Sequence, residues 1–189
     1  MVIRLLPTRW NSNHPSLFQL AIFVFSLFSS SYASSQLSGR FQFDTLRIAN
    51  WPSIHSFSVG YFDTYVLMIG GRKDGIHDKK TGFEITNNNS NIYLWNTQSN
   101  EITEQNLDGL PIELLDFLSA SNHQFVQDSK YLYLMGGYAQ SVLGDFKTYP
   151  YFARIDLQNI ITQILSKQDF TTSIKYTTDD TFAIAGGQL

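Results

Sequence analysis

Apolar runs that end in a pair of glycines occur three times in this 189-residue chain. The runs are Tyr65–Ile69, Tyr131–Met135 and Thr181–Ala185, and the glycine pairs after them are Gly70-Gly71, Gly136-Gly137 and Gly186-Gly187. Short apolar runs without clean alternation, bounded by turn residues, are typical of strands buried on both faces. A glycine pair after such a strand predicts a sharp turn and a close approach by a neighbouring segment, because glycine adopts positive φ without steric cost.

Each run belongs to a longer unit that predicts four strands. A strand precedes each run (residues 55–62, 119–126 and 172–176), and two more follow the first two glycine pairs after a long loop (91–95 with 101–103, and 151–157 with 160–164). Helical periodicity is confined to a turn or two at residues 111–118. A repeat of four strands predicts the blades of a β-propeller, and another all-β sandwich or barrel is the alternative.

The order of the unit resembles the kelch repeat, a blade with a double glycine after its second strand. Kelch blades favour an aromatic residue in the third strand and, after six residues, a Trp in the fourth. Here Trp95 is followed at that spacing by Ile102, and the second unit has Ile155 and Thr162 at these places. The resemblance covers residues 51–189 and implies an all-β chain of kelch-like, four-stranded antiparallel blades.

The repeats divide the chain into five parts. We expect a signal peptide at 1–33, a lead-in strand that could close a ring at 34–50, a first blade at 51–110, a second at 111–168 and half of a third at 169–189. Propellers usually close with four to eight blades, so about two and a half blades predict an incomplete ring. The chain is then expected to be a fragment or truncated product that needs missing blades or self-association.

The N-terminal segment has the order of a secretory signal peptide. Arg4 and Arg9 precede an apolar run at residues 17–28, small residues follow, and cleavage is predicted after Ala33. An uncleaved anchor or a buried helix are the alternatives, but the run of about 12 residues is shorter than the roughly 20 that a span needs. We expect a secreted, periplasmic or cell-surface protein with no stable membrane span after cleavage.

Composition excludes several classes of function. The net charge of −3 provides no basic surface for a nucleic-acid partner, and the absence of cysteine excludes disulfides, thiolate metal sites and cysteine nucleophiles. The sequence contains no nucleophile elbow, phosphate loop or dinucleotide fingerprint. We therefore predict no catalytic residues, no metal and no cofactor.

The polar loop Arg72–Lys80 and three tyrosines, Tyr138, Tyr149 and Tyr151, are candidates for a ligand-binding face, although packing between blades explains the tyrosines better. Asp74, His77 and Asp78 lack the spacing of a known metal motif. His55 and His123 stand at similar places in their units and are interpreted as structural, and Asp116 and Asp169 as turn residues. Asn88-Asn89-Ser90 is a glycosylation sequon, meaningful in a eukaryotic host.

Three functions remain open at the level of sequence. The first is a non-enzymatic, exported binding module that holds a protein or glycan on its blade loops. The second is a fragment of an exported carbohydrate-active enzyme, similar to a sialic acid mutarotase, which convergent acid, His and Arg side chains would favour. The third is a non-functional remnant of a truncated gene.

Overall fold

The computed structural model describes residues 45–75 and 82–187 of the chain. The predicted signal peptide and residues 34–44 of the lead-in segment lie outside these ranges, and residues 45–48 form no strand. Contacts divide the chain into two units, and the one described below runs from Leu46 to Leu189. Within the described ranges no helix is both long and apolar enough to cross a bilayer.

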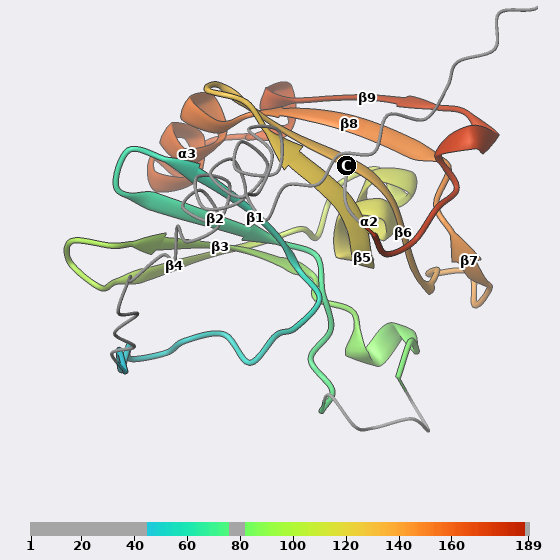
Figure 1. Ribbon diagram of the computed structural model, residues 1–189, viewed down its shortest axis with the longest axis horizontal. Coiled ribbons are helices and arrows are strands. Elements are labelled where there is room, and N and C mark those ends of the chain that lie inside the picture. Colours follow the sequence, from blue (N-terminus) through green and yellow to red (C-terminus); the bar gives the residue numbers. More distant parts are fainter. Residues whose placement is uncertain (1–44, 76–81, 188–189) are drawn as a thin grey trace, which may run out of the picture. The chain divides into compact units, whose positions relative to one another are not determined.

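The first sheet is a four-stranded antiparallel meander in the order β1-β2-β3-β4 (Figure 1). Its strands are β1 (Ser58–Phe62), β2 (Tyr65–Ile69), β3 (Asn91–Asn96) and β4 (Ile102–Asn106). The β1–β2 hairpin turns at Asp63, whose φ of 53° lies in the left-handed region that Asp and Asn tolerate better than most residues. The four strands that the sequence predicts for this part of the chain are confirmed.

The second sheet has five antiparallel strands. β5 (Ser121–Gln127), β6 (Tyr131–Gln140), β8 (Tyr151–Asp156) and β9 (Ile174–Thr178) are paired in that order, and the short β7 (Phe146–Thr148) pairs with the end of β6. β6 is longer than predicted because it continues through Gly136 and Gly137 to Gln140.

Two short α-helices accompany the sheets in the described ranges, so this part of the chain is mostly but not purely β. α2 (Ile112–Ser119) occupies the segment in which a turn or two of helix was expected. Three 3-10 turns complete the regular structure of the described residues: η2 (Ile85–Asn87), η3 (Thr171–Ser173) and η4 (Asp180–Phe182).

The strand predicted at residues 160–164 is wrong, because the chain forms the helix α3 (Leu157–Leu165) there. Leu157, Ile160, Ile161 and Ile164 are the buried residues of this helix, and their spacing of three and four places them on one face. Asp156 caps its first turn, since the Asp156 carboxylate accepts a hydrogen bond from the Asn159 N–H at 3.1 Å. Three isoleucines within five residues favour a strand by propensity, but the helical spacing of the apolar residues and the cap by Asp156 favour a helix, and a helix forms.

Of the two strands predicted for the third unit, the first is present but belongs to the second sheet, and the second is wrong. The segment 172–176 overlaps β9, which pairs with β8 as an outer strand of the second sheet. Residues 181–185 form the end of η4 and irregular chain, so Gly186-Gly187 closes no strand. The antiparallel β class is confirmed, whereas the described residues contain two sheets and no strand of a third.

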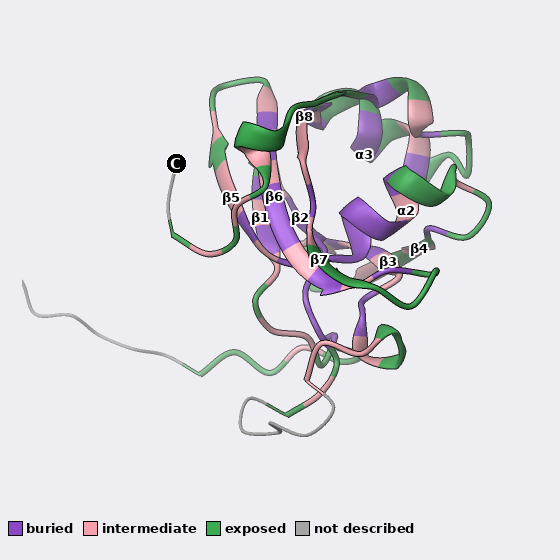
Figure 2. Ribbon diagram, turned by 90° about the vertical axis from the view of Figure 1, so that its right-hand side faces the viewer, coloured by how far each residue is buried: buried purple, intermediate pink, exposed green. Residues whose placement is uncertain are grey.

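The hydrophobic core lies between the two sheets. Leu67, Ile69, Ile92 and Leu94 of the first sheet and Leu132, Leu134, Ala153 and Ile155 of the second belong to one cluster and are almost completely buried. Phe117 and Leu118 of α2 and the apolar face of α3 belong to the same cluster. In Figure 2 the buried segments, in purple, gather on β2, β6, α2 and α3. The two sheets thus share one core.

The six glycines of the three pairs all have positive φ, between 70° and 94°. A Cβ atom at Gly70 would lie 2.4 Å from the Ala120 carbonyl oxygen, and one at Gly136 would lie 1.9 Å from that of Ile184. Both the backbone conformation and the close approach of another segment therefore require glycine at these two positions.

Candidate functional site

A pocket with both polar and apolar side chains in its wall, called the polar pocket below, opens where loops of the first sheet meet α2 and the end of β6. Its volume is about 270 Å³. The lining comprises five residues of the loop between β2 and β3, one after β4, three of α2 and one after β6: Lys73, Ile85, Thr86, Asn88, Ser90, Asp108, Leu115, Asp116, Ser119 and Val142.

The loop between β2 and β3 is held in place by its asparagines. Arg72 and Asn88 form an antiparallel bridge, which continues the first sheet beyond the glycine pair. The Asn89 side-chain amide donates to the carbonyl oxygens of Gly70 and Asn91, both at 2.8 Å. The Asn88 side-chain amide donates to the Gln140 carbonyl oxygen of the second sheet at 2.9 Å, so the Asn88 side-chain oxygen remains available to the pocket.

The helix α2 contributes two polar side chains from one of its faces. Asp116 and Ser119 are three residues apart, a spacing that puts them on the same side of a helix. One oxygen of the Asp116 carboxyl accepts the Val142 N–H at 3.0 Å, which ties the helix to the turn after β6. A helix that packs Phe117 and Leu118 into the core therefore directs a carboxyl and a hydroxyl to the pocket.

Three of the polar groups at the pocket are deeply buried. Asn88, Asp116 and Ser119 are 6%, 4% and 3% exposed. The Asn88 Oδ1 and Ser119 Oγ atoms have no hydrogen-bond partner. Leaving such groups unpaired costs about 1–3 kcal/mol each, so they are positioned to gain from a ligand that supplies donors.

Electrostatics make the Asp116 carboxyl less acidic than usual. Burial raises the pKa of Asp116, while the hydrogen bond from Val142 and the charge of Lys147 act in the opposite direction. Lys73 is exposed and lines the same pocket. A carboxyl whose charged form is disfavoured by burial, in a pocket that a lysine also lines, is a poor environment for a metal cation and a suitable one for hydroxyl groups.

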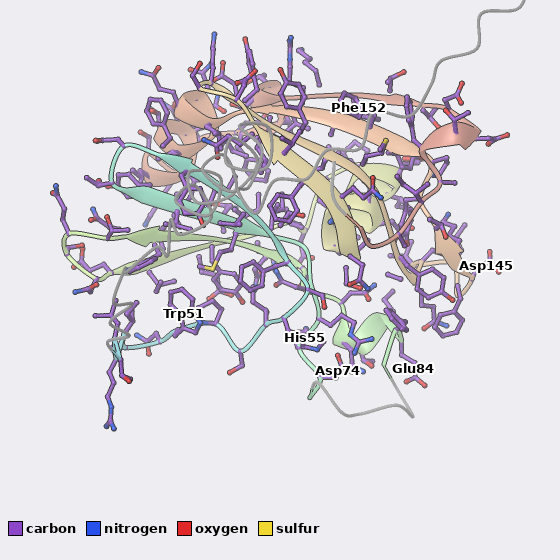
Figure 3. The ribbon with its side chains drawn as sticks, viewed as in Figure 1. Trp51, His55, Asp74, Glu84, Asp145 and Phe152 are labelled. Atoms are coloured by element: carbon purple, nitrogen blue, oxygen red, sulfur yellow. The ribbon has the colours of Figure 1, made fainter. Side chains whose placement is uncertain are left out.

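A second polar cluster lies next to the pocket, where His55, Arg72 and Asp74 converge. The Asp74 Oδ1 atom lies 3.0 Å from the Arg72 Nε atom and 3.5 Å from the His55 Nε2 atom. Figure 3 shows His55 and Asp74 close together, on the loops beyond the strands of the first sheet. Arg72 also lies over the Phe83 ring, 4.2 Å from its centroid. The side chains of Arg72 and Asp74 are 10% and 3% exposed, so the ion pair is sealed against bulky ligands.

The loop that the sequence singled out is only partly described. Of the three residues considered for a metal, Asp74 is engaged by Arg72, while His77 and Asp78 lie outside the described residues. In the ranges 45–75 and 82–187, no three His, Asp or Glu side chains form a group that could hold a metal ion.

The three candidate tyrosines are packing residues. Tyr149 is fully buried, and burial raises the pKa of its hydroxyl, which has no partner. Tyr138 packs edge-on against Phe83 with ring centroids 4.9 Å apart, and Tyr151 packs against Phe117 and Tyr176. None of the three lines the pocket.

His55 and His123 are not at equivalent places, contrary to the interpretation from sequence. His123 lies opposite Gly136 in the second sheet. In the first sheet Ser58 lies opposite Ile69, so Phe57 stands at the level of Gly70. The two histidines also differ in surroundings: His55 belongs to the charged cluster, whereas His123 is buried and contacts the Phe117 carbonyl oxygen at 2.8 Å through Nε2.

The two acids interpreted as turn residues differ as well. Asp169 accepts hydrogen bonds from the Thr171 N–H and hydroxyl, both at 2.9 Å, and is a turn residue. Asp116 lies inside α2 and faces the pocket, so that interpretation is wrong for it. Asn88 of the sequon is buried and already donates to Gln140. Sequence reasoning considered Asn88 only as part of the sequon, and it did not find Ser119, which belongs to no motif.

Compared with known proteins, the chain matches no protein-family model and no curated protein sequence.

Proposed function

We propose that this chain is an exported, non-enzymatic binding module built of kelch-like β-propeller blades, and that the polar pocket holds a glycan. The meander order of the first sheet and the glycine pairs with positive φ support the blade interpretation. The order of basic, apolar and small residues before Ala33 supports export.

One observation carries the choice of ligand: buried polar groups without partners face the pocket. The Asn88 side-chain oxygen is an acceptor, and the Ser119 hydroxyl accepts and donates; neither has a partner. Asp116 and the exposed Asp108 add carboxyl groups to the same wall. A ligand that suits them brings several donors within a small volume, and a sugar ring with adjacent hydroxyls does so. Two carboxyls disfavour an anion, and Lys73 disfavours a metal cation.

The second candidate is a fragment of an exported carbohydrate-active enzyme. The convergence of His55, Arg72 and Asp74 favours it, since an acid, an imidazole and a guanidinium within 3.5 Å are the groups that such chemistry uses. The burial of the Arg72 and Asp74 side chains favours a structural role for the cluster. Binding without turnover is therefore the first choice.

The test measures the binding of glycans to the purified chain, first on a glycan array and then by calorimetry. We expect Ser119→Ala and Asp116→Asn to weaken the selected glycan about tenfold each, the loss that corresponds to about 1.4 kcal/mol. The matched controls are Ser129→Ala and Asp145→Asn, exposed residues that do not line the pocket. Equal affinities for all four variants would exclude this pocket, and turnover of the glycan would favour the enzyme.

A further inference from the structure

The second sheet has one face in the core and one face that no part of the first sheet covers. The second face, called the open face below, carries Val126 on β5, Tyr131, Tyr133 and Met135 on β6, and Phe152 and Arg154 on β8. These residues alternate with the buried core residues of the same strands. They are half-buried or exposed, whereas Leu132, Leu134, Ala153 and Ile155 between them are 0% exposed.

The composition of the open face does not suit contact with water. An antiparallel sheet with one solvated face normally has polar residues on that face. Here the Tyr133 and Phe152 rings stack with centroids 6.0 Å apart, and Arg154 lies over the Tyr131 ring at 4.6 Å (Phe152 is labelled in Figure 3). A contiguous aromatic patch of this kind marks an interaction surface.

Two backbone hydrogen bonds fix the start of the second sheet against the first sheet. The Gly71 N–H donates to the Ala120 carbonyl oxygen at 2.9 Å, and the Asn122 N–H donates to the Ser56 carbonyl oxygen at 3.0 Å. They join the glycine pair and the start of the first hairpin to the residues with which the second sheet begins.

The same two bonds recur between the second sheet and the segment after η4. The Gly137 N–H donates to the Ile184 carbonyl oxygen at 2.8 Å, and the Gly186 N–H donates to the Asn122 carbonyl oxygen at 2.7 Å. Phe182 of the same segment packs against Phe152 on the open face, with ring centroids 5.6 Å apart. Residues 184–186 therefore lie against the second sheet as residues 120–122 lie against the first.

Backbone conformation supports this equivalence. Ser56, Asn122 and Gly186 have positive φ values of 57°, 59° and 71°. Gly186 thus corresponds to Ser56 and Asn122, at the start of a first strand, and not to Gly70 and Gly136, as the glycine pattern suggested. Since Asn122 is the second residue of β5, the chain that follows Gly186 has the direction of the first strand of another sheet.

We propose that the open face is an interface for a partner of defined kind: an antiparallel β-sheet that presents an aliphatic face and lies on the second sheet as the second sheet lies on the first. This proposal is independent of the ligand of the polar pocket. The partner's first strand runs on from the position of Gly186, and its aliphatic side chains cover Tyr133 and Phe152.

The test supplies such a sheet from the chain itself. A second copy of residues 124–187 is appended after Gly187, so that the added β5 begins where the equivalence predicts. We expect Tm of the extended chain to exceed that of the full chain by about 5 °C or more, because new apolar surface is buried. Phe152→Asp in the first copy is expected to remove this gain, while the control Phe146→Asp, an exposed residue of β7, leaves it.

A second measurement does not depend on folding of the extension. In the full chain, Tyr133→Thr with Phe152→Thr should lower Tm by less than about 3 °C, because an interface residue contributes little before its partner binds. A fall of about 10 °C would overturn the proposal, since the aromatic residues would then stabilise the chain's own fold. An extended chain whose Tm responds equally to Phe152→Asp and Phe146→Asp would also overturn it. So would self-association of the full chain that Phe152→Asp abolishes, because the occupant would be a second copy.

Discussion

At the scale of single residues, only glycine combines a positive φ with room for a neighbouring segment at positions 70 and 136. The two residues have the same φ of 70°, and each lies against a carbonyl oxygen of a segment distant in sequence. The sequence pattern predicted the close approach for both. It gave no means of separating them from Gly186, where a Cβ atom would meet nothing within 4 Å.

Gly136→Ala is expected to destabilise the protein by at least about 2 kcal/mol, measured as the urea midpoint of unfolding. The substitution adds left-handed strain and places a Cβ atom 1.9 Å from the Ile184 oxygen. Gly144→Ala is the matched control, because Gly144 has φ of 98° and open space around it. It should cost about 1 kcal/mol from backbone strain alone. Equal costs would show that the contact with Ile184 is loose.

At the scale of elements, the strands were more predictable than their partners. Tyr65–Ile69 and Asn91–Trp95 are runs of β-branched, aromatic and aliphatic residues between turn residues, and such local signals are sufficient for strands. Local signals do not say which strands pair, so β9 was assigned to a third unit although it pairs with β8. In α3 the same isoleucine-rich composition fits both a strand and a helix, and the decision depends on a cap that lies outside the apolar run.

The cap of α3 provides a prediction at this scale. Asp156→Ala should lower the free energy of unfolding by about 1 kcal/mol, because the Asn159 N–H loses its acceptor in the first turn. Asp156→Asn keeps an acceptor oxygen and should retain most of the stability. Thermal unfolding followed by circular dichroism measures both. If Asn were as destabilising as Ala, the exposed ion pair of Asp156 with Lys130 would be the more important contact.

At the scale of the whole molecule, burial of one imidazole connects stability to pH. Burial lowers the pKa of His123 to about 4, below its usual value of 6.5. The unfolded chain takes up a proton below about pH 6.5 that the folded chain does not accept until about pH 4. The contribution of His123 to stability is therefore complete above pH 6.5 and falls by about 3 kcal/mol as the pH decreases to 4.

His123→Phe tests this contribution, because Phe57 stands at the equivalent level of the first sheet. The difference in unfolding free energy between the two proteins should change in favour of the variant between pH 6.5 and pH 4. Comparison of the two chains cancels the opposite effect of Asp116, whose raised pKa persists in both. A constant difference across this range would mean that His123 is hydrated in the folded state.

The polar pocket was beyond the reach of sequence reasoning for a physical reason. Asn88, Asp116 and Val142 are brought together by two hydrogen bonds: that of Asn88 to Gln140 joins the two sheets, and that of Val142 to Asp116 joins α2 to the turn after β6. No spacing along the chain records such contacts. The sequence predicts where most strands end. It does not predict which side chains of the following loops and of α2 come together in the pocket.

The single core between the sheets also has a consequence for the order of events during synthesis. Leu67, Ile69, Ile92 and Leu94 leave the ribosome well before Leu132 and Ile155, the residues that cover them. The strands of the first sheet are therefore synthesised early, but their apolar side chains stay exposed to water. The core between the sheets forms only after β8 and α3 have been synthesised. During that interval the nascent chain can aggregate or bind chaperones. A substitution in α3 therefore delays burial of strands that were synthesised about a hundred residues earlier.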